Sequence, residues 1–156
     1  MLRSGDRARL EELAELLSTF PEGVDSFLAR RWILNAIEMG ARSSIEWMLG
    51  KRVDLAFRDE EGYTPLFTAI DSTRPDRYEI LQMLLRAGAP LNLKGINDWT
   101  PAHLAAARDA VDALRILVAH GADLSIRTDI DEFATPLEEA RTLGSRNAVA
   151  FLESVA

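Results

Sequence analysis

Two short motifs recur along this chain at nearly constant spacing, and this recurrence constrains the fold more than any other feature. Thr-Pro occurs at residues 64–65, 100–101 and 135–136, which are 36 and 35 residues apart. Gly-Ala occurs at residues 88–89 and 121–122, which are 33 residues apart and in phase with Thr-Pro. A period of about 20 to 50 residues is typical of repeat proteins, whose units bury their apolar faces by stacking on one another. The sequence therefore predicts an array of stacked repeats.

Each motif marks one end of a predicted helix. A threonine N-cap accepts a hydrogen bond from a backbone N–H of the first turn, and proline at the next position fits the helical φ without losing a needed donor. Helices are therefore expected to begin after Thr64, Thr100 and Thr135. Gly88 and Gly121 can adopt the left-handed conformation that ends the second helix of a pair.

Between the motifs, apolar residues recur at helical spacing. Spacings of three and four residues place such side chains on one buried helical face. The residues that form this face in the second helices are Ile80, Leu81, Leu84, Leu85, Val111, Leu114, Leu117 and Val118. Small residues in the first helices would let the paired helix approach closely, and they are Ala69, Ala105, Ala106 and Ala140.

These segments together resemble ankyrin repeats. Residues 59–66 and 97–106 are similar to the family's D-G-x-T-P-L-H-x-A-A opening, and residues 84–89 and 117–123 are similar to its L-L-x-x-G-A-D close. The resemblance covers roughly residues 31–155. It implies an all-α, ankyrin-type solenoid of stacked helix–turn–helix repeats joined by turn or hairpin loops. It does not identify a partner, because one fold serves many functions.

The predicted organisation is a single ankyrin repeat domain over residues 1–156. It comprises capping helices in 1–30, a degenerate first repeat in 31–60, repeats in 61–96 and 97–130, and a capping repeat in 131–156. A first capping helix is expected over residues 6–19, and Asp25 could cap a second one. In the first repeat Arg31-Trp32 replaces Thr-Pro, and Arg52 stands where glycine is usual. About three extra residues around 73–75 should lengthen the turn in the second repeat.

Composition excludes several classes of function. The formal net charge is −7, with 18 basic and 25 acidic residues, and nucleic-acid binders instead neutralise phosphates with basic groups. The absence of cysteine removes disulfides, thiol catalysis and cysteine-based zinc sites. The amino terminus is charged, and no stretch approaches the roughly 18 apolar residues of a membrane span. A cytoplasmic monomer that binds neither nucleic acid nor membrane is expected.

No pattern of catalytic, cofactor or metal residues stands out, so the chain is expected not to be an enzyme. His103 falls on the Thr-Pro-Leu-His position of the family, which implies a structural hydrogen bond between adjacent turns. His120 lies in the last turn of a helix, where a surface role is expected. The acidic groups at 59–61 and 129–132 lack the glycine and distal glutamate of a calcium loop. Glycine-rich phosphate loops are absent.

The aromatic residues indicate a binding surface. Tyr63 and Trp99 both precede Thr-Pro, and Phe133 or Ala134 corresponds to them in the fourth repeat. The resemblance implies that this position points from the turn toward the concave side, where aromatic side chains often dominate binding energy. The alternative is that these rings pack on the neighbouring turn. The predicted partner-binding residues are Tyr63, Trp99, Ile96, Asp98, Phe133, Ile130, Asp131, Arg108, Asp109, Asp71, Arg74, Glu38 and Met39.

The predicted surface is an aromatic ridge with many carboxylates and few arginines. It suits another protein that carries basic groups, so an adaptor or inhibitor is the main hypothesis. A bacterial toxin-immunity protein that neutralises a cognate effector is a sharper version, because small acidic ankyrin-like proteins resemble that class. A structural or engineered scaffold without a natural partner is a second hypothesis, and an enzyme accessory or an enzyme with a cryptic site is a third.

Overall fold

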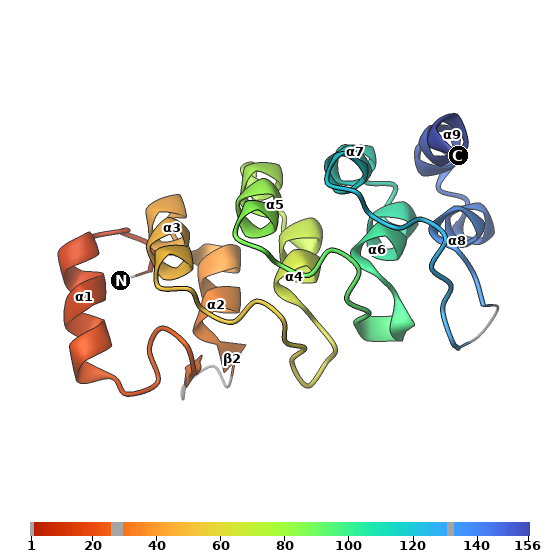
Figure 1. The fold of residues 1–156 in the computed structure, drawn as a ribbon. Helices are drawn as coiled ribbons and strands as arrows, with labels where there is room; N and C mark the ends of the chain where they lie inside the picture. The colour runs from red at the N-terminus through yellow and green to blue at the C-terminus, as the bar shows by residue number, and fades with distance from the viewer. Residues whose placement is uncertain (1, 26–29, 131–132) are drawn as a thin grey trace.

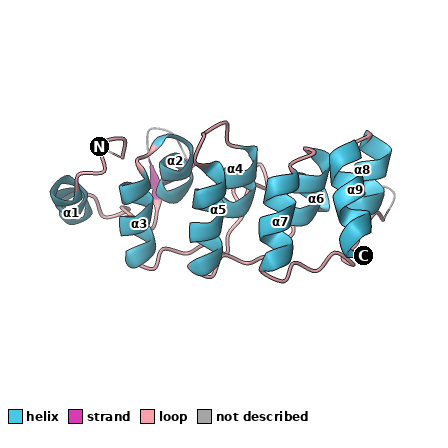
Figure 2. Ribbon diagram, turned by 90° about the horizontal axis from the view of Figure 1, so that it is seen from above, coloured by secondary structure: helices cyan, strands magenta, loops and turns pink. Residues whose placement is uncertain are grey.

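The chain forms an elongated stack of helix pairs. The computed structural model describes residues 2–25, 30–130 and 133–156, which contain nine α-helices, one 3-10 helix and two short strands. Figures 1 and 2 show two rows of helices, with α2, α4, α6 and α8 in one row and α3, α5, α7 and α9 in the other. The elements are α1 (Arg7–Leu16), β1 (Val24–Asp25), β2 (Arg30–Arg31), α2 (Trp32–Met39), α3 (Arg42–Gly50), α4 (Pro65–Asp71), α5 (Arg77–Arg86), η1 (Ile96–Asp98), α6 (Pro101–Ala107), α7 (Val111–Ala119), α8 (Pro136–Leu143) and α9 (Arg146–Val155).

The Thr-Pro motifs begin helices as expected. Proline is the first residue of α4, α6 and α8, and the preceding threonine is the N-cap in each case. Thr64 Oγ1 accepts the Phe67 N–H at 3.3 Å, and Thr135 Oγ1 accepts the Glu138 N–H at 3.3 Å. These bonds satisfy backbone donors that the first turn cannot pair by itself.

The second helices end in left-handed residues. Gly88 and Gly121 have φ of 92° and 87°, and the following Ala89 and Ala122 donate back to carbonyls five residues earlier, at 3.0 Å. This is the Schellman geometry expected from the Gly-Ala motifs. Arg52 takes the same place in the first repeat with φ of 59°, a conformation that disfavours a residue with a Cβ.

One apolar core runs the length of the stack. The predicted alanines of the first helices are at most 1% exposed, which confirms that they allow close packing. Leu81, Leu84, Leu114 and Leu117 of the second helices are fully buried. Val111 and Val118 are only half-buried, because they lie nearer the outer surface of α7.

The amino-terminal cap differs in part from the prediction. The first capping helix is shorter than expected, since α1 covers Arg7–Leu16, and its Leu10 packs into the core. Asp25, which was expected to cap a second helix, is the last residue described before residue 30, so that expectation stays a prediction. Asp25 lies in β1, which pairs antiparallel with β2, and its carboxylate accepts a bond from the buried Asn35 at 3.3 Å. Residues 26–29, where the second helix was expected to start, lie outside the described residues.

The carboxy-terminal repeat carries polar residues on its outer side. Arg141 and Glu153 stand at the positions that Ala106 and Val118 hold in the preceding repeat, 35 residues earlier. Their side chains form an ion pair at 2.7 Å. A polar outer face is what a terminal repeat needs to remain in contact with water. The boundaries assigned to the repeats stay predictions.

The turn between α4 and α5 is longer than its counterparts, as the extra residues predicted. It spans residues 72–76, whereas residues 108–110 join α6 to α7. Arg74 lies in this turn and donates to both carboxylate oxygens of Asp76 at 2.8 Å and to the Gly40 carbonyl of the previous repeat. None of the helices described is both long and apolar enough to cross a membrane.

Candidate functional site

A groove of about 760 Å³ lies on the first two repeats. It is bounded by the β1–β2 hairpin, by the loop at residues 57–63 and by the exposed sides of α2 and α4. We refer to it as the concave groove. Its charged and aromatic lining consists of Arg30, Arg31, Glu38, Phe57, Arg58, Asp59, Glu60, Glu61, Tyr63 and Asp71.

Tyr63 is held in the groove by its own loop. Gly62 precedes it with φ of 87°, and a Cβ there would lie 2.9 Å from the Ile96 nitrogen of the next loop. The Tyr63 N–H donates to Asp59 Oδ1 at 2.7 Å, and its hydroxyl donates to Asp71 Oδ2 at 3.1 Å. Burial and the bond to the Asp71 carboxylate raise the pKa of the Tyr63 hydroxyl. Tyr63 is therefore fixed as a neutral donor.

Asp71 links two successive repeats and lines both this groove and a second hollow, which Arg108 also lines. Besides the Tyr63 hydroxyl, it accepts bonds from Arg108 Nε at 2.7 Å and Arg108 Nη2 at 3.1 Å. This fork-like pairing uses both carboxylate oxygens. The structure thus brings together the predicted residues Tyr63, Asp71 and Arg108. Both carboxylate oxygens of Asp71 accept hydrogen bonds from side chains of this chain.

The amino-terminal end of the groove contains contacts that sequence reasoning missed. Arg30 Nη1 lies 2.8 Å from Glu38 Oε2, and Arg30 Nε lies 3.9 Å from Asp59 Oδ2. The Arg31 guanidinium lies over the Phe57 ring, 4.3 Å from its centroid. No local signal marks these arginines, because the β1–β2 hairpin brings them to the groove. Met39, predicted beside Glu38, is 40% exposed but does not line the groove.

The predicted residues at the third repeat's loop are engaged in bonds between loops. Lys94 Nζ donates to Asp98 at 2.8 Å and to Asp129 of the next loop at 2.6 Å, and the Asp129 N–H donates to Asp98 at 2.5 Å. Ile96 donates its N–H to the Gly62 carbonyl at 2.9 Å. The hydrogen bonds of Lys94 to Asp129 and Asp98 raise its pKa. These bonds hold the loops in register.

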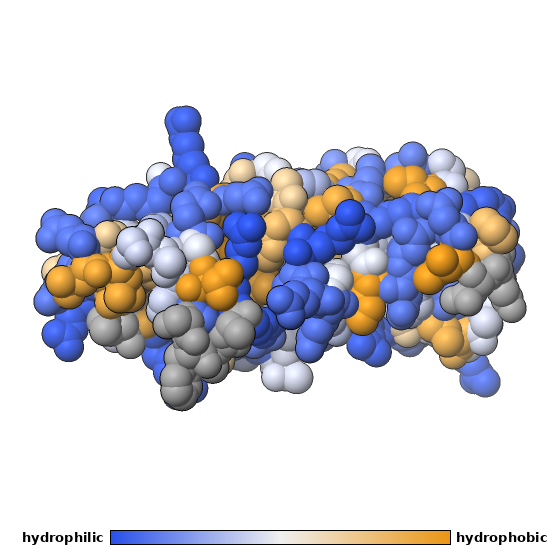
Figure 3. Space-filling view, turned by 90° about the horizontal axis from the view of Figure 1, so that it is seen from below, coloured by the Kyte–Doolittle hydropathy of each residue, from blue (hydrophilic) through white to orange (hydrophobic). Residues whose placement is uncertain are grey.

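An exposed aromatic ridge is only partly present. Tyr63, Ile96 and Trp99 are half-buried and pack against the core. Ile130 and Phe133 are 48% and 59% exposed. Figure 3 shows the loop face as mainly hydrophilic, with separate apolar patches rather than a continuous stripe. Asp131 lies outside the described residues, and the roles of all these residues in binding stay predictions.

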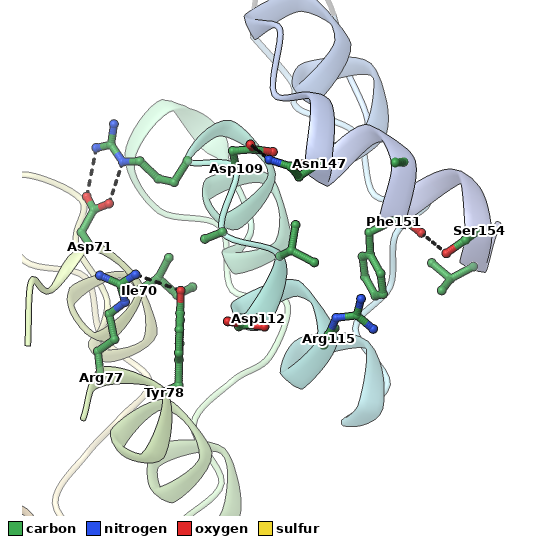
Figure 4. A pocket seen from close by; sticks show the side chains of 15 residues that line it. Ile70, Asp71, Arg77, Tyr78, Asp109, Asp112, Arg115, Asn147, Phe151 and Ser154 are labelled. Carbon is green, nitrogen blue, oxygen red and sulfur yellow. Dashed lines mark hydrogen bonds and ion pairs between the residues drawn. The ribbon is translucent and has the colours of Figure 1, made fainter. Parts of the chain in front are cut away.

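A second hollow of about 1170 Å³ lies at the turns between paired helices, and we call it the turn-side hollow (Figure 4). Asp109, which was predicted for the concave side, lies here with φ of 52°. It accepts bonds from Asn147 Nδ2 at 2.6 Å and from the Ala148 N–H at 2.7 Å. Arg77 donates to the Tyr78 hydroxyl at 2.9 Å. Because most of its polar groups bond to one another, this hollow is a seam between repeats.

His103 is buried and serves the fold. The Thr100 N–H donates to His103 Nδ1 at 3.2 Å, which requires an unprotonated Nδ1. Nε2 therefore carries the proton and donates to the Ala134 carbonyl of the next repeat at 2.9 Å. Burial lowers the pKa of this imidazole, so the neutral form is favoured. Within the described residues, no three His, Asp or Glu side chains gather closely enough to hold a metal ion.

Comparison with known proteins supports the resemblance seen in the sequence. A family model described as ankyrin repeats (3 copies) matches residues 75–154. XBAT34 of Arabidopsis thaliana, whose name places it among E3 ubiquitin-protein ligases, is 38% identical over 98 residues, covering 62% of this chain and 25% of that protein. The RelA-associated inhibitor of Mus musculus is 31% identical over 107 residues, covering 69% of this chain and 12% of that protein.

A third relative matches almost the whole chain. Protein phosphatase 1 regulatory subunit 12A of Mus musculus is 28% identical over 141 residues, covering 89% of this chain and 13% of that protein. The chain thus spans a quarter or less of the length of these relatives. The similarity concerns their repeat regions. The activities of the whole proteins are therefore not attributed to this chain.

Proposed function

Because the chain belongs to the ankyrin repeat family, we propose that it acts as a non-catalytic module that binds a partner protein through the concave groove and the adjoining loops. Ankyrin repeats are protein–protein interaction modules. Within that role, we propose an adaptor or inhibitor whose partner presents basic groups.

The charge balance of the concave groove carries this proposal. Five carboxylates line it against three arginines. Two of these arginines have contacts within the chain, since Arg30 pairs with Glu38 and Arg31 lies over Phe57. The side chains of Glu60 and Glu61 form no ion pair with any described residue. A partner with basic groups would be steered toward such a surface and aligned on it.

The names of two relatives support a regulatory role. One is called an inhibitor and another a regulatory subunit of a phosphatase, so each is named for an action on another protein. We propose that this chain likewise acts by occupying a partner rather than by changing it chemically.

A charge reversal tests the function without disturbing the core. The double variant Glu60→Lys/Glu61→Lys should lose most capture of the natural partner in a pull-down from the native cell, because it places cations where the partner's cations bind. The matched control is Glu12→Lys/Glu15→Lys, which makes the same charge change on exposed positions of α1. Equal capture of the partner by both variants would show that the concave groove is not part of the binding surface.

Truncation of the two aromatic rings tests their contribution to binding. Tyr63→Ala/Trp99→Ala should weaken capture by at least about 2 kcal/mol if these rings are hot spots. Since both rings also pack against the core, unfolding of this variant must be measured alongside. Leu16→Ala, at a position 71% exposed on α1, controls for loss of an apolar side chain. Unchanged affinity in a folded double variant would assign the rings to packing alone.

A further inference from the structure

The concave groove holds two arginines of its own chain, and they show what kind of side chain it accommodates. Arg30 and Arg31 form β2, whose antiparallel pairing with β1 presents them along the edge of the groove. Arg30 faces Glu38 of α2 and Asp59 of the following loop, at 2.8 Å and 3.9 Å. A single guanidinium therefore lies between a carboxylate of α2 and a carboxylate of the loop that precedes α4.

The contact with Asp59 is incomplete. A separation of 3.9 Å is too long for a hydrogen bond. Asp59 Oδ1 is fixed by the N–H groups of Tyr63 and Glu61, at 2.7 Å and 3.1 Å. Asp59 Oδ2 accepts no hydrogen bond from the residues that the structure describes. The carboxylate is thus held rigidly while one oxygen stays available for a further donor.

Arg31 makes the second type of contact that suits a guanidinium. Its planar group lies 4.3 Å from the centroid of the Phe57 ring, and its ion pair with Asp54 is loose at 3.8 Å. Stacking on an aromatic face together with forked hydrogen bonding to carboxylates is characteristic of arginine more than of lysine. The two subsites are therefore a carboxylate pair and an aromatic face.

We propose that the concave groove binds an arginine-bearing extended segment of the partner protein, and that Arg30 and Arg31 occupy its subsites until that segment displaces them. This proposal rests on the proposed function and names the chemistry of the partner. Exchange is energetically accessible, because ion pairs between partly exposed side chains contribute little: the side chains of Arg30 and Glu38 are 29% and 40% exposed.

Removal of Arg30 tests the proposal directly. A short fluorescent peptide of alternating glycine and arginine is titrated at low salt, with anisotropy as the readout. Arg30→Ala should bind it about two- to five-fold more tightly than the unmodified chain, because Glu38 and Asp59 become free. The affinity for a matched glycine–lysine peptide should increase less, since lysine cannot form the forked contact.

Two variants separate the specific gain from a general charge effect. Arg141→Ala removes the same charge and frees Glu153, a more exposed carboxylate on the outer face of the last repeat. The increase in peptide affinity that Arg141→Ala produces measures the non-specific effect of removing one positive charge. Adding Asp59→Asn to Arg30→Ala should cancel the gain. The proposal is overturned if Arg30→Ala does not increase the affinity for the arginine peptide more than Arg141→Ala does. It is also overturned if Arg30→Ala increases the affinity for the arginine and lysine peptides equally.

Displacement is also measurable in the unmodified chain. The Nε–H signals of Arg30 and Arg31 in nuclear magnetic resonance should shift as the arginine peptide is added, while that of Arg141 stays fixed. Unchanged Arg30 and Arg31 signals at saturation, or no binding of the peptide to any variant, would contradict displacement. Failure of the proposed function is distinct: partner capture would then be insensitive to Glu60 and Glu61, while Arg30→Ala still gained peptide affinity.

Discussion

The first and third repeats differ in what fixes the ends of their helices. The third repeat begins at Thr100-Pro101 and ends at Gly121, so backbone geometry sets both of its ends. The first repeat has Arg31 before α2 and the left-handed Arg52 after α3. It is instead supported by side chains from α1 and the β1–β2 hairpin, including the bond from Trp47 to Glu11 at 2.8 Å. The same irregular elements build one wall of the concave groove.

This contrast suggests that departure from the repeat pattern and formation of a site are connected. In the regular repeats the loops bond to each other through Lys94, Asp98 and Asp129, which leaves few free groups. In the first repeat the added hairpin supplies Arg30 and Arg31, which other repeats lack at that position. Whether the two regions also differ in stability can be measured by substitution in each of them.

The largest expected effect concerns the shared core. Leu114→Ala in the third repeat and Met48→Ala in the first should each cost about 2–5 kcal/mol, because both side chains are fully buried and truncation leaves a cavity. Urea unfolding followed by circular dichroism measures both. Similar losses in one common transition would show that the two regions unfold together, whereas a small loss for Met48→Ala would show that the first repeat is loosely packed.

The next effect is a pH dependence of stability, to which the third repeat should contribute through a buried histidine. His103 is neutral and buried in the third repeat, whereas the first and second repeats place Leu34 and Phe67 at the same position. Its folded pKa is lowered, so the unfolded chain binds the proton more readily below the unfolded pKa of about 6.5. Stability should be constant above that pH and should fall below it, by at most roughly 1.4 kcal/mol per pH unit.

Unfolding midpoints between pH 7.5 and 5.5 check this dependence. His103→Gln should flatten the profile in that range, because glutamine does not titrate there. His120→Gln is the control, since His120 is exposed at the end of α7. A pH profile that survives in His103→Gln would assign the dependence to other groups.

A smaller effect concerns the helix ends. Arg52→Gly should stabilise the chain by about 0.5–1 kcal/mol, because glycine adopts positive φ without a Cβ penalty. Gly121→Ala should destabilise it by about 1 kcal/mol for the converse reason, since a Cβ there would meet no atom within 4 Å and only the conformation is at issue. Thermal unfolding measures both, and a loss of stability in Arg52→Gly would mean that the arginine side chain contributes contacts of its own.

The smallest effect belongs to the outer face of the last repeat. Arg141→Ala should cost at most about 0.2–1 kcal/mol, because Arg141 and Glu153 are both about half exposed and water competes for their charges. The cost should shrink further in high salt. A cost well above 1 kcal/mol in urea unfolding would show that this pair supports the terminal repeat rather than merely covering it.

The predictable part of the fold consists of elements with local signals. Helices α4, α6 and α8 begin where Thr-Pro places them, and Gly88 and Gly121 end their partners as expected. Asp25 carries a local signal as well, since aspartate is a favourable N-cap, yet it pairs with Arg30 in a short strand ladder. A capping propensity contributes only about 1 kcal/mol, so tertiary contacts easily override it.

The candidate site was predictable only in its location. Tyr63 and Asp71 lie in the concave groove as inferred, since their positions follow from the repeat register. Asp109 and Arg74 instead bond across repeats on the turn side, to Ala148 and Gly40. The repeat register suggested the groove for Asp109, and the extra residues of the turn suggested it for Arg74. The direction of such a side chain near a helix end depends on which partner lies beside it.

The sequence by itself determined the repeat fold of this protein, because the start and end of each helix depend on backbone preferences that a few neighbouring residues express. The tertiary structure decided which charges are available for binding. Asp71 is satisfied by Arg108 from 37 residues away, while Asp59 meets Arg30 from 29 residues away only loosely. Such pairings arise when distant segments are brought together by the shared core, and no short stretch of sequence encodes them.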